Sequence, residues 1–478
     1  MYAAAFSARR VRAFHLVSKP IRAFVACNVG STPALSDSKF INLSTVTKKD
    51  LETVITSWGH PRFRADQVWN WIRDKGVTNV EEMNNIPKKL RQQLAEYSKP
   101  TSLELASELR SKDGTIKRAY RCYDGQLIES VLMPYEDGRY TACISSQAGC
   151  AQGCVFCATG QMGFSRQLTA DEIFEQVARF AAESQHEDVV HETKSKQHGR
   201  SNRLSNVVFM GMGEPLANYR HVSTAINRIT QDLGIGARKI TVSTVGIVPN
   251  IRKLTTDPNM PQVRLAVSLH CATDEERDVL LPANKRYGGL DELMGCLREY
   301  IEVTGRRVTL EWALIAGEND TPETARKLAR LIQKSRLRKD MVHVNVIPLN
   351  PTGGFGGNPS DRKRVNDFVN TLEKDFGIAC TPRVRRGIDI DAGCGQLKSK
   401  VLEKELQDTR LKAIVKDDAT SESKMMIGKE FTYDNAINIE EEDFEDPEFN
   451  DELSKAETAR LLNLVKATTI DLSKLDGQ

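Results

Sequence analysis

Residues 150 to 157 read Cys150-Ala-Gln-Gly-Cys154-Val-Phe-Cys157, a C-x3-C-x2-C spacing that brings three thiols within eight residues. Three thiolates this close together can bind three irons of a four-iron cluster, and the fourth iron is then left without a protein ligand. Because an open iron can bind a small molecule directly, the spacing favours catalysis over simple electron storage. We therefore expect a catalytic iron–sulfur site here.

Zinc is the main alternative for the three cysteines. A structural zinc site needs four closed ligands, usually from two C-x2-C or Cys/His pairs. Cys154 and Cys157 form one C-x2-C pair, and the chain contains no second C-x2-C. A disulfide explains the group poorly, because three neighbouring cysteines leave one unpaired.

The whole chain is long enough, at 478 residues, for two or three domains. Ten cysteines are few for this length, which argues against a disulfide scaffold, and an iron–sulfur enzyme needs a reducing compartment. No run of eighteen or more apolar residues occurs, so we expect no membrane span.

The charge is unevenly distributed. Residues 421–478 hold 15 acidic and 6 basic residues, a net of −9, so the total of +3 leaves about +12 on the first 420 residues. A basic body with an acidic tail is compatible with a polyanionic partner such as RNA, although solvated surface charge explains it as well.

The N-terminal 43 residues resemble an organellar transit peptide. The first 36 contain five basic residues, no acidic residue and many alanines and serines. We expect residues 1–43 to be a transit peptide or a disordered extension, with the chloroplast favoured over the mitochondrion.

Composition and periodicity divide the remaining chain into four parts. We expect a helical accessory unit over 44–100, in which basic residues alternate with aromatics, and a β-rich connector over 101–142. Residues 143–412 form the predicted catalytic domain. Residues 413–478 are predicted to be a largely disordered acidic tail.

Strands and helices alternate after Cys157. Helix-start signals support the pattern: Thr169 with Glu172 forms a predicted capping box, and Thr321 precedes Pro322. The alternation predicts an α/β fold with a parallel sheet, open or bent into a partial barrel. The expected strands are Val207–Met212, Lys239–Ile247, Val263–His270, Val308–Ile315, His343–Leu349 and Thr381–Arg386.

Polar and glycine motifs follow several of these strands. Ligand sites of such folds lie at the carboxyl ends of the strands, and the shared location of the motifs is more informative than any one of them. Their residues include Gly213, Glu214, Ser243, Ser268, Leu269, His270 and Asn350.

These motifs and the cysteine spacing closely resemble the RlmN/Cfr family of radical S-adenosylmethionine (SAM) RNA methyltransferases. The resemblance covers about residues 48 to 412 and suggests a plant-type organellar member. It also includes Phe63-Arg64-Ala65-Asp66-Gln67-Val68, Met210-Gly211-Met212-Gly213-Glu214-Pro215 and Asp389-Ile390-Asp391-Ala392-Gly393-Cys394-Gly395-Gln396-Leu397.

The resemblance implies a fold, cofactors and residue roles. The fold would be a partial (β/α)6 barrel. Cys150, Cys154 and Cys157 would bind one 4Fe-4S cluster, and the strand-end residues above would bind SAM. Cys394 would carry the methyl group, Cys143 would be its redox partner, and Glu129 would accept a proton.

The implied reaction consumes two SAM molecules. One methylates Cys394, and the second is cleaved at the cluster to a radical that activates this methyl group. The activated carbon adds to adenine in a covalent protein–RNA adduct, Glu129 removes the ring proton, and Cys143 forms a disulfide with Cys394 to release the product. Cys143 and Cys394, 251 residues apart, must therefore approach each other.

The expected function is methylation of adenine C2 in 23S-type ribosomal RNA, with tRNA as a further candidate substrate. The alternatives are C8 methylation, which the quoted motifs do not exclude, and an RNA-binding homologue without activity. Ferredoxin or flavodoxin is the expected electron donor, and we expect a monomer without membrane association.

Overall fold

The computed structural model describes residues 41–73, 77, 79–99, 101–190 and 203–397. The predicted acidic tail, and the predicted transit peptide except for residues 41–43, lie outside the described residues. Among the residues described, no helix has the length and apolar character needed to cross a bilayer.

The N-terminal helical unit has its own hydrophobic core. Leu51, Val68 and Leu90, one from each of its α-helices, are buried in it. Residues before the predicted start at 44 also belong to the unit, because β1 pairs in parallel with β2 at its other end. Its elements are β1 (Ile41–Asn42), α1 (Lys48–Ser57), α2 (Phe63–Arg73), a 3₁₀ turn (Val80–Glu82), α3 (Lys88–Tyr97) and β2 (Ser98–Lys99).

A ten-stranded mixed sheet organises the rest of the described chain, in the order β14-β13-β12-β11-β10-β9-β6-β5-β4-β3. Strands β6 and β9 to β14 are parallel, and β3 to β5 extend them as an antiparallel edge. The strands are β3 (Leu103–Arg110), β4 (Ile116–Cys122), β5 (Leu127–Pro134), β6 (Arg139–Cys143), β9 (Arg203–Phe209), β10 (Ile240–Thr244), β11 (Arg264–Ser268), β12 (Val308–Leu314), β13 (Val342–Pro348) and β14 (Ala379–Pro382).

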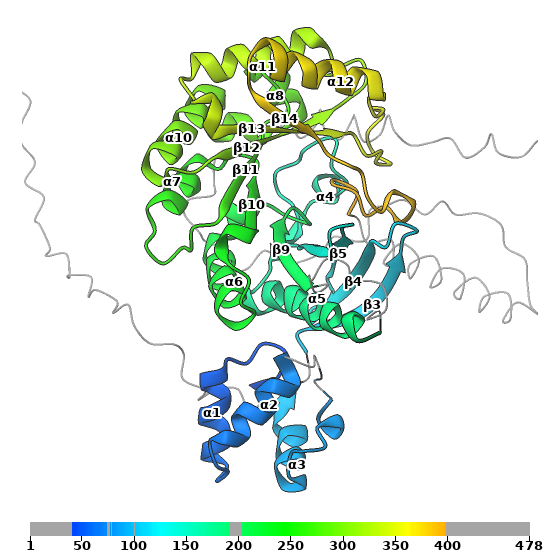
Figure 1. The fold of residues 1–478 in the computed structure, drawn as a ribbon, viewed down its shortest axis with the longest axis vertical. Coiled ribbons are helices and arrows are strands. Elements are labelled where there is room, and N and C mark those ends of the chain that lie inside the picture. The colour runs from blue at the N-terminus through cyan, green and yellow to red at the C-terminus, as the bar shows by residue number, and fades with distance from the viewer. Residues whose placement is uncertain (1–40, 74–76, 78, 100, 191–202, 398–478) are drawn as a thin grey trace, which may run out of the picture. The chain divides into compact units, whose positions relative to one another are not determined.

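Six parallel strands are each followed by a long helix in the described chain, which confirms the predicted α/β fold and gives six β/α units. Figure 1 shows α6, α7, α10 and α11 along the outer side of the curved sheet and α4 on its inner side. The helices are α4 (Ala158–Gln161), α5 (Ala170–Val190), α6 (Tyr219–Asp232), α7 (Val248–Thr256), α8 (Asp274–Leu280), α9 (Ala283–Arg286), α10 (Gly289–Thr304), α11 (Pro322–Lys334) and α12 (Arg362–Asn370).

The predicted boundary between residues 142 and 143 lies inside β6. This strand pairs with β5 on one side and with β9 on the other, so the hydrogen-bonded sheet is continuous across it. The β-rich connector is therefore structurally an extension of the catalytic sheet.

Several strands end earlier than predicted, and β9 shows why. It ends at Phe209, not Met212, because the chain then turns close to the backbone after β6. Gly211 N–H donates to Ile144 O, and a Cβ on Gly211 would lie 2.7 Å from the Ile144 carbonyl carbon. The glycine motif after β9 is thus a loop.

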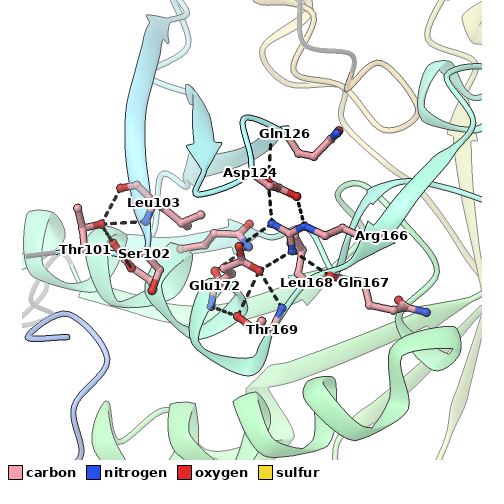
Figure 2. Close-up of polar contacts among 12 residues, drawn as sticks. Thr101, Ser102, Leu103, Asp124, Gln126, Arg166, Gln167, Leu168, Thr169 and Glu172 are labelled. Carbon is pink, nitrogen blue, oxygen red and sulfur yellow. Dashed lines mark hydrogen bonds and ion pairs between the residues drawn. The ribbon is translucent and has the colours of Figure 1, made fainter. Parts of the chain in front are cut away.

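The predicted capping box at the start of α5 is confirmed (Figure 2). Thr169 N–H donates to Glu172 Oε2 over 2.9 Å, and Glu172 N–H donates to Thr169 Oγ1 over 3.2 Å. Arg166, on β8 (Phe164–Gln167), bonds both Glu172 and Asp124 in the turn between β4 and β5. One guanidinium therefore joins β8, the β4–β5 turn and α5.

Candidate active site

The cysteine loop connects β7 (Gln147–Gly149) to α4, and glycine gives it its shape. Gly149 has φ of +78°, and a Cβ there would lie 2.1 Å from Gly163 O. A Cβ on Gly160 would lie 2.9 Å from Cys154 O. Larger residues at these positions would force the loop open, so the turn depends on glycine.

All three thiols of the loop line one cavity, which we call the cluster cavity. Burial raises the pKa of Cys150 to about 12 and also raises the pKa values of Cys154 and Cys157. Among the described residues, no three His, Cys, Asp or Glu side chains converge as a single metal ion requires. A four-iron cube does not need that convergence, because each thiolate binds a different iron.

The strand-end motifs line the same cavity, as the fold predicted. It is partly open to solvent, so a ligand can enter it. The predicted residues on its wall are Gly213, Glu214, Ser243, Ser268, His270 and Asn350. Leu269 is fully buried and does not line the cavity.

Glu214 is buried and held by backbone groups. Its Oε1 accepts from Leu216 N–H (2.9 Å) and its Oε2 from Val245 N–H (2.7 Å). Burial raises its pKa to about 7, and these hydrogen bonds oppose the rise. Each carboxylate oxygen retains a further lone pair, so Glu214 can still accept a bond from a ligand ammonium group.

His270 is fixed as a neutral donor. Its Nδ1 accepts from Ala313 N–H over 2.9 Å, so the ring hydrogen is assigned to Nε2. Burial and the charge of Arg277 lower its pKa to about 3. The residue has φ of +60°, which is uncommon outside glycine, and its ring meets Phe156 edge-on. This arrangement presents one N–H donor at the cavity wall.

Cys394 lies on the wall of the cluster cavity and also on that of a smaller one, which it shares with Cys143. We call the smaller one the cysteine-pair cavity. The two cysteines are thus brought together as expected, and both are free thiols. Burial raises the pKa of Cys143 to about 12, and the charge of Cys394 acts in the same direction. The disulfide between them stays a prediction for turnover.

Comparison with known proteins identifies the family. Residues 41–99 match the ribosomal RNA large subunit methyltransferase N-terminal domain, and residues 144–332 match the radical SAM superfamily. A dual-specificity RNA methyltransferase RlmN 1 from Myxococcus xanthus is 46% identical over 363 residues, which cover 75% of this chain and 95% of that protein. The chain belongs to the RlmN family of radical SAM RNA methyltransferases.

Other RlmN-family relatives agree with this assignment. A probable dual-specificity RNA methyltransferase RlmN from Moorella thermoacetica is 43% identical, over 75% of this chain and 97% of that protein. A crystal structure of a radical SAM methyltransferase from Sphaerobacter thermophilus has a TM-score of 0.65 and 42% identity, covering 75% of this chain and 99% of that one.

Membership in the radical SAM superfamily implies a 4Fe-4S cluster and SAM. The donor set fits both groups. Each of the three cysteines on one wall can bind an iron as a thiolate. Burial raises the pKa of Cys154, and the charge of Arg277 opposes this rise. At the strand ends, Glu214 would supply acceptors and His270 a donor for the polar groups of SAM.

Glu129, the predicted proton acceptor, lines neither cavity. It is 3% exposed, and its Oε1 lies 3.6 Å from Lys117 Nζ. Its backbone is also held, because its N–H donates to Met212 Sδ and its carbonyl accepts from Ser145 Oγ. On β5 it shares a face with Met133, which lines the cysteine-pair cavity.

Sequence reasoning missed Arg277, which organises the strand ends at the predicted SAM side of this RlmN-type site. Its buried guanidinium donates to the carbonyls of Leu269 (3.2 Å), Ser268 (3.0 Å) and Val245 (2.5 Å). The side chain thus joins the ends of β11 and β10. A single arginine in the helical stretch Asp274–Leu280 gives no signal of this role in sequence.

Two further charged residues, Arg383 and Glu311, were also missed. Both line the cluster cavity, and Arg383 also lines the cysteine-pair cavity. The charge of Cys394 is the largest influence raising the pKa of Arg383, and burial raises the pKa of Glu311. A charged residue inside the apolar run Val308–Leu314 was a usable signal, because fully buried parallel strands are normally apolar.

Proposed function

We propose that this protein methylates C2 of an adenine in large-subunit, 23S-type ribosomal RNA, with tRNA as a second substrate class. One observation carries the proposal. Cys394 lines both cavities, so one residue borders the predicted SAM site and also the cavity that contains Cys143. This arrangement suits a cysteine that receives a methyl group in one cavity and forms a disulfide with Cys143 in the other, which releases the methylated RNA.

The residues around Cys394 support its role as methyl carrier. When bound, two SAM molecules per turnover and the cluster supply a methyl group and an adenosyl radical. The nucleophilic form of Cys394 is the thiolate. The guanidinium of Arg383 lies close enough to Cys394 for the two charges to interact. Asn350 Nδ2 donates to Cys394 O over 3.1 Å and fixes the backbone.

Glu129 and Cys143 complete the proposed reaction. Glu129 takes the proton from the adenine ring carbon in the covalent adduct, and the adduct must also lose one electron, which the cluster would accept, before the sulfur–carbon bond is cleaved. Cys143 Sγ then attacks Cys394 Sγ: a disulfide bond forms, the sulfur–carbon bond breaks, and its electron pair leaves with the carbon, which takes a proton from solvent and becomes the RNA methyl group. A thiol reductant restores both cysteines. Because burial raises the pKa of Cys143 to about 12, its thiol is protonated at neutral pH and must lose that proton before this attack.

Nucleoside mass spectrometry tests the proposal. The reconstituted protein, with SAM and reductant, should convert adenosine in 23S-type rRNA to 2-methyladenosine. Cys394→Ala should abolish methylation, and Cys143→Ala should trap RNA covalently on the protein. Cys296→Ala, a buried cysteine on α10, is the matched control and should retain activity. Methylation by Cys394→Ala would exclude the carrier mechanism, and 8-methyladenosine would correct the regiochemistry.

We also propose an organellar location, the chloroplast rather than the mitochondrion, with ferredoxin or flavodoxin as electron donor and a monomeric enzyme. The basic, acid-free first 36 residues support the targeting proposal. A fusion of residues 1–43 to a fluorescent protein should enter chloroplasts. Light scattering should give a mass near 53.4 kDa for the full chain.

A further inference from the structure

Lys117 on β4 is a buried lysine beside Glu129. Only 4% of the residue is exposed, and its Nζ lies 3.6 Å from Glu129 Oε1. The register places Ala119 opposite Glu129 and Lys117 opposite Val131, so the two charged residues are diagonal neighbours on one face. Burying an ammonium group away from water is costly unless a partner and hydrogen bonds compensate it. The pairing of these two side chains is therefore a specific feature of the site.

The same ammonium group also contacts the segment of residues 388–397, which carries Cys394 and which we call the Cys394 segment. Lys117 Nζ donates to Asp391 O over 3.2 Å, three residues before the cysteine. Asp391 has φ of +51°, a left-handed conformation that non-glycine residues adopt only where neighbours hold them. One cation thus contacts both the predicted base and the backbone leading to the predicted methyl carrier.

Other bonds also hold this segment near both ends. Asp113 accepts from Gly387 N–H over 3.0 Å, and Ala158 N–H donates to Gly395 O over 2.7 Å. Lys117 contacts both this segment and the Glu129 carboxylate. Its loss would remove one bond from the segment and the ion pair that connects the segment to Glu129.

We propose that Lys117 is a positioning residue for the methyl-transfer reaction: it fixes the Glu129 carboxylate and the Cys394 segment relative to each other. The inference rests on the proposed function. In the step it serves, the bond between the adenine ring carbon and its hydrogen breaks, the electron pair stays on the adduct, and the proton forms an O–H bond with a Glu129 oxygen. A base displaced by even about 1 Å loses much of its rate.

Substitution of Lys117 separates proton removal from the earlier steps. Lys117→Met removes the ammonium group but keeps a chain of similar length, and Lys117→Arg retains the charge. We expect Lys117→Met to form 5′-deoxyadenosine at close to the wild-type rate. Product release should fall by about 10²-fold, the range typical of a positioned base. The covalent RNA adduct should accumulate, as it should in Glu129→Gln, and Lys117→Arg should restore part of the product.

A surface lysine provides the matched control. Lys327 pairs with Glu276 on the surface, and Lys327→Met should leave adduct and product unchanged. Unchanged product release in Lys117→Met would overturn the proposal. So would an equal fall of 5′-deoxyadenosine and product without adduct, because that result would indicate a merely structural role.

Hydrogen exchange tests the contact without turnover. In protein free of SAM and RNA, amides of the segment 388–397 should exchange faster in Lys117→Met than in the wild type, and Lys327→Met should not change them. Unchanged exchange would overturn the link between Lys117 and the Cys394 segment. If the wild type made neither 5′-deoxyadenosine nor methylated RNA, the proposed function would fail, and this exchange result would still decide the contact.

Discussion

Burial sets the ionisation of individual residues in this site. The folded pKa of His270 is about 3, against an ordinary value of 6.5. Above pH 6.5 the folded and unfolded chains are both neutral at this position. As the pH falls from 6.5 towards 3, the unfolded chain binds a proton that the folded chain does not, so the free energy of unfolding decreases.

His270→Gln should reduce this acid sensitivity. Between pH 7 and pH 5, its free energy of unfolding should depend on pH less steeply than that of the wild type, by about 1 kcal/mol per pH unit. Urea unfolding at several pH values measures the difference. Identical slopes for the two proteins would show that His270 is protonated in the folded state, contrary to the structure.

Gly213 is a second position at which one residue controls the site. It has φ of +96°, and a Cβ there would lie 2.4 Å from Gln147 Cβ. We expect Gly213→Ala to weaken SAM binding strongly and to lower the free energy of unfolding by about 1–3 kcal/mol. Equilibrium dialysis with SAM and urea unfolding give the two quantities.

Gly236→Ala is the control for this substitution. Gly236 has no heavy atom within 4 Å of a Cβ built on it, and its φ of −58° suits any residue. This variant should bind SAM normally and stay within about 0.5 kcal/mol of the wild type. If Gly213→Ala behaved like Gly236→Ala, the loop after β9 would accommodate a Cβ at position 213, contrary to the structure.

At the scale of elements, chain-local signals predicted helix starts well. Thr169 with Glu172 and Thr321 with Pro322 both form the predicted caps, because an N-cap depends on residues three positions apart. Strand ends were predicted less well, since they depend on which backbone the chain next approaches. The loop after β9 turns at Gly211 because of Ile144, a residue 67 positions earlier.

The capping box of α5 should contribute measurably to stability. Thr169→Ala removes the acceptor for Glu172 N–H, and we expect a loss of about 1 kcal/mol in the free energy of unfolding (Figure 2). Thr224→Ala, an exposed position within α6, should change it by less than about 0.5 kcal/mol. Urea unfolding of both variants checks this, and equal effects would mean that the cap is not formed in solution.

At the scale of the molecule, the continuous sheet makes a prediction about fragments. A chain of residues 101–410 keeps all ten strands, whereas a chain of 143–410 removes β3 to β5 and nearly all of β6. The shorter fragment would expose the edge of β9, and open edges promote aggregation. We expect cooperative thermal unfolding, followed by circular dichroism, only for residues 101–410. A cooperative transition of 143–410 at the same temperature would contradict this.

The sequence by itself determined the family, the α/β class and most of the candidate site. Cysteine spacing, strand-end motifs and caps depend on residues that are close together in the chain, so they can be recognised from the sequence. The same reasoning missed Arg277, Arg383 and Lys117. Each is an ordinary basic residue in sequence, and each acquires its role only from partners that folding brings to it.

Tertiary structure alone decided how the predicted residues are arranged. It brought Cys143 and Cys394 to one cavity and kept Glu129 off both cavity walls, paired with Lys117. It also joined the connector to the catalytic sheet through β6. The physical reason is that burial, charge pairing and strand pairing are long-range properties: a side chain's ionisation and reach depend on neighbours hundreds of positions away, and no local pattern encodes them.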